Sequence, residues 1–425
     1  MTEVSSSARD VSPLAAELAD DVLERFLRYV RIDTQSAYGQ STTPSTAKQL
    51  DLSRVLEAEL REIGLEDVRL DEFGYVYGSL PGRAGAPVIG LIAHVDTSPD
   101  VTGTGVEPQV HRDYDGSRIV LSGDETQVLD PEEQPALAEK IGHDLVTTDG
   151  TTLLGADDKA GVAEIMAAVA YLKRNPDLEH APLRVCFTVD EEIGAGADRL
   201  DLEEFGAEFA YTLDGSGRGE IEAETFNAWK VTVTIHGRAV HPGSAKGKLV
   251  SSIRLAADFI AALPRDRLSP ETTEEREGFI HPTAISGTGE KTVIELIVRD
   301  HDKAKLDGHL ALIRGIVDMI GLKEPRARLV VTEDESYRNM REVIDRHPRV
   351  IAAAEEAVRR VGVEPVHAII RGGTDGARLS ARGLPTPNIF TGGQEYHSLR
   401  EWASVHDMAA AAATVVELAR VWAES

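Results

Sequence analysis

Hydrophobic residues in the first half of the chain form short runs, without regular alternation, that end at polar residues. The runs are PVIGLIA before His94, LRVCFTV before Asp190 and EFAYTL before Asp214. Runs of this length without alternation are typical of strands buried on both faces, as in a mostly parallel sheet with helices on either side. Residues 12–30 and Lys159–Lys173 repeat hydrophobic positions at helical spacing. These patterns predict an α/β fold with a central, mostly parallel sheet flanked by helices.

From about Lys230 the pattern changes to the alternation typical of half-buried strands, as in KVTVTIHG. In order, the following pattern predicts a helix at 250–263, strands at 279–286 and 292–299, a helix at 303–320 and a strand at 326–332. This βαββαβ order is that of ferredoxin-like domains. We therefore predict one α/β domain in two segments, 1–226 and 333–425, with a lid domain of residues 227–332 inserted between them.

The composition of the chain excludes several classes of protein. The 425 residues carry a formal net charge of −27, which opposes binding to the phosphates of nucleic acid. The single cysteine, Cys186, cannot form an internal disulfide, so a disulfide-stabilised secreted scaffold is excluded. The N-terminal residues lack a signal-peptide pattern, and no uncharged run reaches the roughly 18–20 residues of a membrane span. We expect a cytoplasmic protein without nucleic-acid or membrane partners.

Side chains that can bind metals follow each of the three hydrophobic runs. His94 and Asp96 follow the first run, Glu191 and Glu192 the second, and Asp214 the third. In open α/β sheets, ligands bind beyond the carboxyl ends of the strands. We therefore expect these side chains to share one edge of the sheet.

Two glycine-containing turns add further candidates. LGADDKAG places Asp157 and Asp158 immediately before a predicted helix, and GGQEYH places His397 late in the chain. Taken alone, the Asp-Asp pair could be a helix cap rather than a metal site. Each of the other motifs, taken alone, also has a structural explanation. Together the motifs would bury several carboxylates in one cleft, which is costly without cations.

The combined set suits zinc or a similar divalent ion. It comprises two imidazoles and three carboxylates: His94, Asp157, Glu192, Asp214 and His397. Two dications and a shared hydroxide would neutralise the three carboxylates, and such a pair of ions lowers the pKa of the water between them towards ~7. Glu191 is then suited to act as general base and acid. Asp96 is suited to accept the second N–H of His94.

Several rival motifs are absent from the sequence. The segment 287–292 lacks the spacing of a phosphate-binding loop, and 215–220 lacks the last glycine of a dinucleotide-binding loop. No HExxH and no G-x-S-x-G motif occurs. Cys186 lies within a predicted buried strand, where a thiol is usually inert.

Several blocks of the sequence resemble the peptidase T family, tripeptide aminopeptidases among the co-catalytic dizinc peptidases related to bacterial carboxypeptidases and aminoacylases. The blocks are HVDTSPD (94–100), TLLGADDKAG (152–161), TVDEEIGAG (188–196), YTLDG (211–215), HPGSAKG (241–247), REGFIHP (276–282), NMRE (339–342), RGGTDGA (371–377) and FTGGQEYH (390–397). The resemblance implies a catalytic domain, a lid that mediates a homodimer, and two zinc ions per subunit, with cobalt or manganese as substitutes.

The resemblance also implies roles for individual residues. Asp157, rather than Asp158, is the bridging ligand, with His94 and Asp214 on one metal and Glu192 and His397 on the other. Glu191 is the general base. Asp96 is the acidic residue that supports the metal ligand His94. The peptide bond after the bridging aspartate is often cis in the family. His241 is expected to stabilise the oxyanion and Arg371 to hold the substrate's terminal carboxylate, with Arg299 as a weaker candidate and Asn388 as a pocket residue of no derived role.

Three functions remain open from the sequence. The leading interpretation is an aminopeptidase that hydrolyses the N-terminal residue from tripeptides. A second is a deacylase or carboxypeptidase that acts on N-acyl amino acids. A third is a metal-dependent binding protein without catalysis, against which Glu191 argues, because a scaffold needs no base beside its ligands.

Overall fold

The computed structural model describes residues 11–424, and these residues form two compact units. Unit 1 extends to Ala223 and also includes Glu342–Ala368 and the chain from Thr374 onward. Unit 2 comprises Glu224–Arg341 and Ile369–Gly373. Each unit has its own hydrophobic core.

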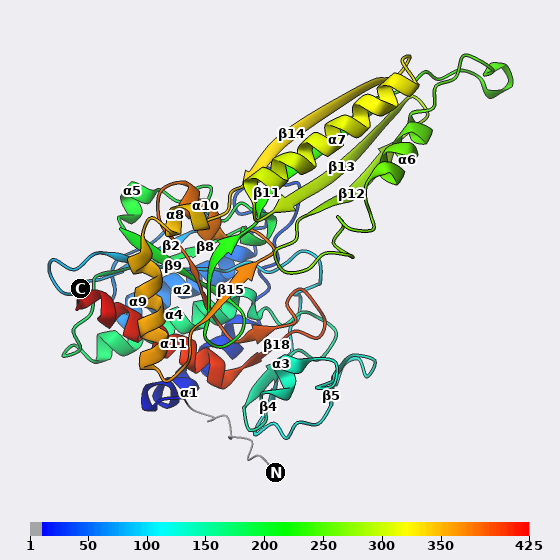
Figure 1. Ribbon diagram of the computed structural model, residues 1–425. Helices are drawn as coiled ribbons and strands as arrows, with labels where there is room; N and C mark the ends of the chain where they lie inside the picture. Colours follow the sequence, from blue (N-terminus) through cyan, green and yellow to red (C-terminus); the bar gives the residue numbers. More distant parts are fainter. Residues whose placement is uncertain (1–10, 425) are drawn as a thin grey trace, which may run out of the picture. The chain divides into compact units, whose positions relative to one another are not determined.

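The core of unit 1 is an eight-stranded mixed sheet (Figure 1). In spatial order its strands are β1 (Glu66–Leu70), β2 (Val76–Leu80), β8 (Leu183–Thr188), β3 (Ile89–His94), β9 (Phe209–Gly215), β16 (Asn388–Phe390), β10 (Glu220–Thr225) and β15 (Val366–Ile370). The central strands β8, β3, β9 and β16 run parallel. All residues of β3 are buried, which explains its unbroken hydrophobic sequence. The predicted α/β fold is confirmed.

Long helices pack against this sheet and against each other. They are α1 (Pro13–Tyr29), α2 (Gln49–Ile63), α4 (Ala156–Arg174), α9 (Pro348–Arg360) and α11 (Val405–Ala423). Shorter helices are α3 (Pro135–Ala138), α5 (Leu202–Phe205), α8 (Arg341–Ile344) and α10 (Asp375–Ala381). The Ser12 side chain caps α1 by accepting a hydrogen bond from Ala15 N, as the Ser-Pro start favours.

Two small sheets complete unit 1. One contains β17 (Gly393–Gln394), β18 (Trp402–Ser404), β7 (Leu145–Thr147) and β4 (Gln109–His111); the other pairs β5 (Ile119–Val120) with β6 (Val128–Leu129). These strands contain two or three residues each, too few to produce a periodic pattern in the sequence.

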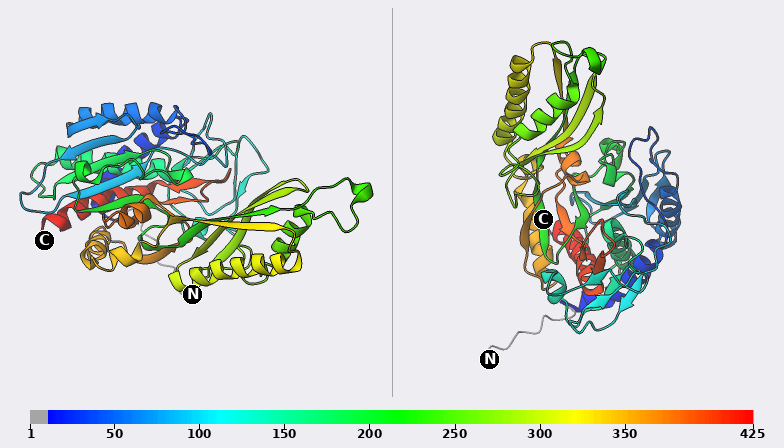
Figure 2. Two further views of the ribbon diagram at one scale, coloured as in Figure 1. Left: turned by 90° about the horizontal axis from the view of Figure 1, so that it is seen from above. Right: turned by 90° about the vertical axis from the view of Figure 1, so that its right-hand side faces the viewer.

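Unit 2 has the βαββαβ order that the sequence predicts. Its elements are β11 (Asn227–His236), α6 (Ser252–Ala262), β12 (Phe279–Gly287), β13 (Lys291–Asp300), α7 (Lys303–Lys323) and β14 (Arg328–Tyr337). The strands form an antiparallel sheet in the order β12-β13-β11-β14. Both helices contact β11 and β13 and each other, and they lie along one face of the sheet (Figure 2).

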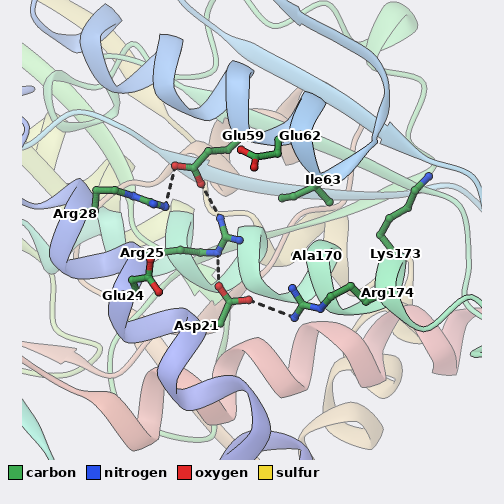
Figure 3. Close-up of a pocket in the computed structure, with 10 residues that line it drawn as sticks. All are labelled: Asp21, Glu24, Arg25, Arg28, Glu59, Glu62, Ile63, Ala170, Lys173 and Arg174. Atoms are coloured by element: carbon green, nitrogen blue, oxygen red, sulfur yellow. Dashed lines mark hydrogen bonds and ion pairs between the residues drawn. The ribbon is translucent and has the colours of Figure 1, made fainter.

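Charged side chains of α1, α2 and α4 line a groove of about 380 Å³ (Figure 3). Glu59 accepts hydrogen bonds from Arg25 and from the Tyr29 hydroxyl, both at 2.6 Å, and Arg25 also pairs with Asp21 at 2.7 Å. The lining has four acidic and four basic residues, so its charges cancel: Asp21, Glu24, Glu59 and Glu62, with Arg25, Arg28, Lys173 and Arg174. We interpret the groove as a structural ion-pair network between helices. Among residues 11–424 no helix is long and apolar enough to cross a membrane.

Glu164, on α4, is fully buried, and neither of its carboxylate oxygens has a hydrogen-bond partner among the described residues. Burial, with the nearby charge of Asp407, raises its pKa well above its ordinary value of 4.5. The folded protein therefore keeps a proton that the unfolded chain releases above about pH 4.5, so this group lowers stability as pH rises.

We expect Glu164→Gln to weaken the pH dependence of unfolding. Because glutamine needs no proton to remain neutral, the variant should be more stable than wild type at pH 8 by about 1–3 kcal/mol, with a smaller difference near pH 5. Urea denaturation of both proteins at the two pH values measures this effect. Parallel stability profiles would show that Glu164 is ionised in the folded protein.

Candidate metal centre

Five side chains from separate segments of unit 1 meet at the carboxyl ends of its central strands. His94 ends β3, and Asp214 lies near the end of β9. Glu192 lies in the short helical turn Glu191–Ile193 that follows β8. Asp157 lies in the first turn of α4, and His397 follows β17. The sequence prediction that these groups share one edge of the sheet agrees with this arrangement.

The two oxygens of Asp157 face different groups of side chains. Oδ1 lies 2.9 Å from His94 Nε2, which is 3.7 Å from Asp214 Oδ1. Oδ2 lies 3.2 Å from His397 Nε2, which is 2.9 Å from Glu192 Oε2. One carboxylate thus lies between a His–Asp pair and a His–Glu pair, which is the geometry that a bridging ligand needs.

A close approach of α4 to β9 makes this arrangement possible. A Cβ atom on Gly161 would lie 1.8 Å from the Leu213 carbonyl oxygen. Only glycine therefore lets the start of α4 lie against the end of β9. This contact brings Asp157 to the strand end that carries Asp214.

The imidazoles in the cluster hold protons strongly. Burial lowers the pKa of His94, but hydrogen bonds with Asp157 and Asp214 outweigh it, so this pKa lies well above its ordinary value. Hydrogen bonds with Asp157 and Glu192 raise the pKa of His397 to about 11.

The carboxylates respond in opposite directions. Burial raises the pKa of Asp157, but hydrogen bonds with His397 and His94 outweigh it and leave that pKa below its ordinary range. Burial, followed by the charge of Asp157, raises the pKa of Glu192 to about 8. Burial also raises the pKa of Asp214. The cluster therefore attracts positive charge.

The donor set fits divalent cations. The ligand atoms form two groups, His94 with Asp158 and Asp214, and Asp157 with Glu192 and His397, and the atoms of each group lie within 4.8 Å of one another. Imidazole nitrogen and carboxylate oxygen are typical zinc donors. The Glu192 Oε1 atom is buried without a hydrogen-bond partner among the described residues, so a cation could use it. Neutralising buried carboxylates also removes much of their burial cost.

Asp158 is held by the main chain rather than presented to the cluster. Its Oδ2 accepts a hydrogen bond from His94 N at 3.0 Å, and its Oδ1 accepts one from Gly161 N at 3.2 Å. The Asp157–Asp158 peptide is cis, as the family resemblance implies. Asp157 is therefore the member of the pair with both carboxylate oxygens directed at other candidate ligands.

Asp96 supports the cluster from behind. It is fully buried, its main-chain carbonyl oxygen lies 3.0 Å from His94 Nδ1, and its carboxylate Oδ1 lies 3.3 Å from the same nitrogen. The Asp96 carboxylate also accepts hydrogen bonds from the main-chain N–H groups of Glu191 and Glu192, at 3.0 and 3.3 Å. Asp96 thus fixes both the His94 ring and the turn that carries Glu191.

The Glu191 carboxylate accepts no hydrogen bond within residues 11–424. Burial is the main cause that raises its pKa well above the ordinary value, while the charge of His94 opposes the shift. Asp190 holds the turn from the other side, because its carboxylate accepts hydrogen bonds from Ser45 N at 2.7 Å and Gln49 Nε2 at 2.6 Å. The turn is fixed while the Glu191 carboxylate stays free for a reactant.

Sequence reasoning did not identify two buried carboxylates beside the cluster. Asp375 accepts a hydrogen bond from Thr188 Oγ1 at 2.8 Å, and burial raises its pKa to about 7. Glu401 accepts three main-chain hydrogen bonds, two from the loop before α4 and one from Asp157 in its first turn. The position of Asp375 within RGGTDGA is a signal that could have found it, whereas Glu401 follows no buried strand and belongs to none of the quoted motifs.

Asn388, on β16, belongs to a buried hydrogen-bond network. Its Oδ1 accepts hydrogen bonds from Thr212 Oγ1 and, at 3.1 Å, from Thr374 Oγ1. Its Nδ2 donates to Glu222 Oε2 at 3.2 Å. The network reaches the end of β9 close to Asp214, and this gives Asn388 a structural role that the sequence did not suggest.

The remaining candidates lie in unit 2. Arg371 donates hydrogen bonds to the carbonyl oxygens of Thr273, Glu275 and Glu277, at 2.8–3.2 Å. Arg299 Nη1 donates to the Arg371 carbonyl oxygen at 3.2 Å. These contacts give Arg371 a role in holding the 273–277 loop, separate from any contact with substrate.

His241 is exposed and begins the short helical turn Pro242–Ser244. Its Nδ1 accepts a hydrogen bond from Gly243 N at 3.1 Å. That bond fixes the ring tautomer with the proton on Nε2. An oxyanion could accept a hydrogen bond from this Nε2–H group.

Comparison with known proteins gives the family. The model of peptidase family M20/M25/M40 matches residues 139–421. A peptidase T from Exiguobacterium is 48% identical over 405 residues, covering 95% of this chain and 98% of its own. The structure of aminopeptidase PepT from Bacillus cereus aligns with a TM-score of 0.74 and 24% identity, covering 95% and 99% of the two chains. A tripeptidase structure from Staphylococcus aureus aligns with a TM-score of 0.75 and 22% identity, covering 96% and 99%.

The family model covers Asp157, Glu192, Asp214 and His397 of the predicted metal centre and begins after His94. The alignment with the Exiguobacterium relative extends over 95% of the chain and includes both units. The chain therefore belongs to peptidase family M20/M25/M40 and, within it, to the peptidase T group.

Proposed function

We propose that this peptidase is a two-metal aminopeptidase that removes the N-terminal residue of tripeptides. The observation that carries the proposal is the position of Asp157, whose two oxygens lie within 3.2 Å of two different imidazoles. His94 and Asp214 would complete one zinc site, and Glu192 and His397 the other, with cobalt or manganese as substitutes. Bound there, the two ions would polarise the scissile carbonyl and lower the pKa of a water molecule.

The chain's own residues supply the proton transfers. Glu191 would accept a proton from the attacking water and deliver it to the leaving amine nitrogen, as general base and then acid. Its free carboxylate on a turn fixed by Asp96 and Asp190 supports this role. Asp96 would keep His94 in the tautomer that presents Nε2 to the metal.

Substrate recognition is assigned to four residues. His241 would donate a hydrogen bond to the oxyanion, and Arg371 would hold the terminal carboxylate of the peptide, with Arg299 as its alternative. A guanidinium fork suits a carboxylate, and Arg371 would then exchange part of its present bonding to the 273–277 loop. Asn388 would shape the pocket through its contact with Glu222.

The choice between tripeptides and N-acyl amino acids is tested by direct assay. We expect the zinc-loaded enzyme to cleave tripeptides with a free N-terminus at least about tenfold faster than their N-acetylated forms, N-acetyl amino acids and dipeptides. Relatives named peptidase T and tripeptidase support this expectation. Preferential release of acetate from N-acetyl amino acids would instead establish a deacylase.

We further propose that the enzyme is cytoplasmic and forms a homodimer through its lid domain, residues 227–332, which lies within unit 2. The proposal rests on the resemblance to peptidase T and on the two exposed edge strands, β12 and β14, of the unit 2 sheet. An unpaired edge offers main-chain donors and acceptors to a second copy. Sedimentation velocity should show a dimer, and a single monomeric species would contradict the proposal.

A further inference from the structure

Glu401 has a buried carboxyl group that faces main-chain N–H groups of residues 154–157, at the start of α4. The residue is 1% exposed. Its Oε2 accepts hydrogen bonds from Leu154 N at 2.8 Å and Gly155 N at 2.9 Å, and its Oε1 accepts one from Asp157 N at 3.2 Å. These bonds join segments that lie 244 to 247 positions apart in the chain. No side-chain cation pairs with Glu401 within the described residues.

This contact is energetically significant for the loop. If Glu401 were removed, the buried N–H groups of Leu154 and Gly155 and the partly buried N–H group of Asp157 would lose their acceptor, and a buried donor without a partner is costly. Gly155 adopts a left-handed backbone conformation, φ 83°, at the point where the chain passes from the two N–H groups bonded to Oε2 to the Asp157 N–H group bonded to Oε1.

Glu401 also connects the two halves of the metal centre. It lies four positions after His397, on the segment that leads from β17 into β18. Through Asp157 N it holds the residue whose oxygens face both imidazoles. The same short segment therefore supplies one ligand, His397, and fixes the main chain of the ligand between the two sites.

We infer that Glu401 is a positioning residue for the metal centre, which sets the place of the Asp157 carboxylate relative to His397 by holding the 154–157 main chain. The inference rests on the proposed two-metal function. Replacing a group that orients a metal ligand typically lowers metal affinity or activity by about 10- to 100-fold.

The test compares Glu401→Gln and Glu401→Asp with wild type in a zinc titration against a chromophoric chelator. Glutamine retains one acceptor oxygen but turns an NH₂ group towards an N–H donor, and aspartate retains the charge but is one methylene too short. We expect zinc affinity to fall about 10- to 100-fold in both variants. For tripeptide cleavage, kcat should fall while KM changes less than about twofold, because the substrate contacts are unaffected.

Asp71→Asn is the matched control. Asp71 also accepts two main-chain hydrogen bonds, from Phe73 N and Tyr75 N, each at 2.9 Å, in the turn between β1 and β2. It should lower the melting temperature of the zinc-free protein and leave zinc affinity unchanged, which separates positioning from loss of stability.

Wild-type zinc affinity in Glu401→Gln would overturn the inference, whatever the melting temperature. If Glu401→Asp bound zinc as tightly as wild type while Glu401→Gln did not, the inference would also be wrong, because the negative charge of residue 401 rather than its position would then determine zinc affinity. The zinc titration needs no substrate. If wild type failed to cleave tripeptides, the proposed function would be wrong, while the affinity difference would still decide the role of Glu401.

Discussion

Replacing Glu191 with glutamine is expected to abolish tripeptide hydrolysis while the protein still binds its metal ions. The Glu191 carboxylate belongs to neither ligand group, and it accepts no hydrogen bond within residues 11–424, so its removal leaves those groups intact. Glutamine has the same shape but cannot accept the proton of the attacking water. General acid–base catalysis contributes about 10²- to 10⁴-fold, so kcat should fall by that factor. Glu191→Ala should lose activity to a similar extent.

Two measurements are needed on the same preparations: kcat for a tripeptide and metal content by mass spectrometry. Glu203→Gln is a suitable control, because Glu203 is an exposed residue of α5 in the same unit and should retain full activity and full metal content. If Glu191→Gln kept more than a tenth of wild-type kcat, another group would handle the proton. If the variant lost its metal, Glu191 would be a ligand rather than a base.

The strands β3 and β8, which lead to the metal centre, could be predicted because nearly all of their residues are buried. Both strands are covered on both faces, so hydrophobic residues dominate their sequences without alternating with polar ones, and acidic or histidine side chains follow where each hydrophobic run ends. The end of the first run locates His94, and the end of the second locates Asp190 and the adjacent Glu191. The lid could be predicted for the opposite reason, since β11 alternates buried and partly exposed residues.

Residues that act through the main chain could not be found in this way. Glu401 is recognised by three N–H groups, and every residue except proline offers an N–H group, so its partners leave no pattern in the sequence. The small β17–β18–β7–β4 sheet next to Glu401 could not be predicted either, because its strands are short and come from distant segments of the chain. The role of Arg371 in holding the 273–277 loop was likewise invisible, since its acceptors are carbonyl oxygens.

The largest effect on metal binding is expected from Asp157. If its carboxylate bridges two cations, Asp157→Ala should lose both ions, whereas His397→Ala should lose only the ion that His397 and Glu192 share. Metal analysis after dialysis should therefore give two ions per chain for wild type, one for His397→Ala and essentially none for Asp157→Ala. Neither variant should cleave tripeptides at a measurable rate.

Zinc-dependent stability gives an independent measurement of the same variants. A ligand at 100 times its Kd stabilises the folded state by about 2.7 kcal/mol, so excess zinc should raise the melting temperature of wild type clearly and that of Asp157→Ala hardly at all. Asp158→Asn is a control that changes a carboxylate close to the cluster without removing a proposed ligand, because the Asp158 oxygens accept hydrogen bonds from His94 N and Gly161 N. It should keep more zinc than Asp157→Ala. Equal metal loss in His397→Ala and Asp157→Ala would instead indicate two ions that bind only together, and full metal retention in Asp157→Ala would exclude a bridging aspartate.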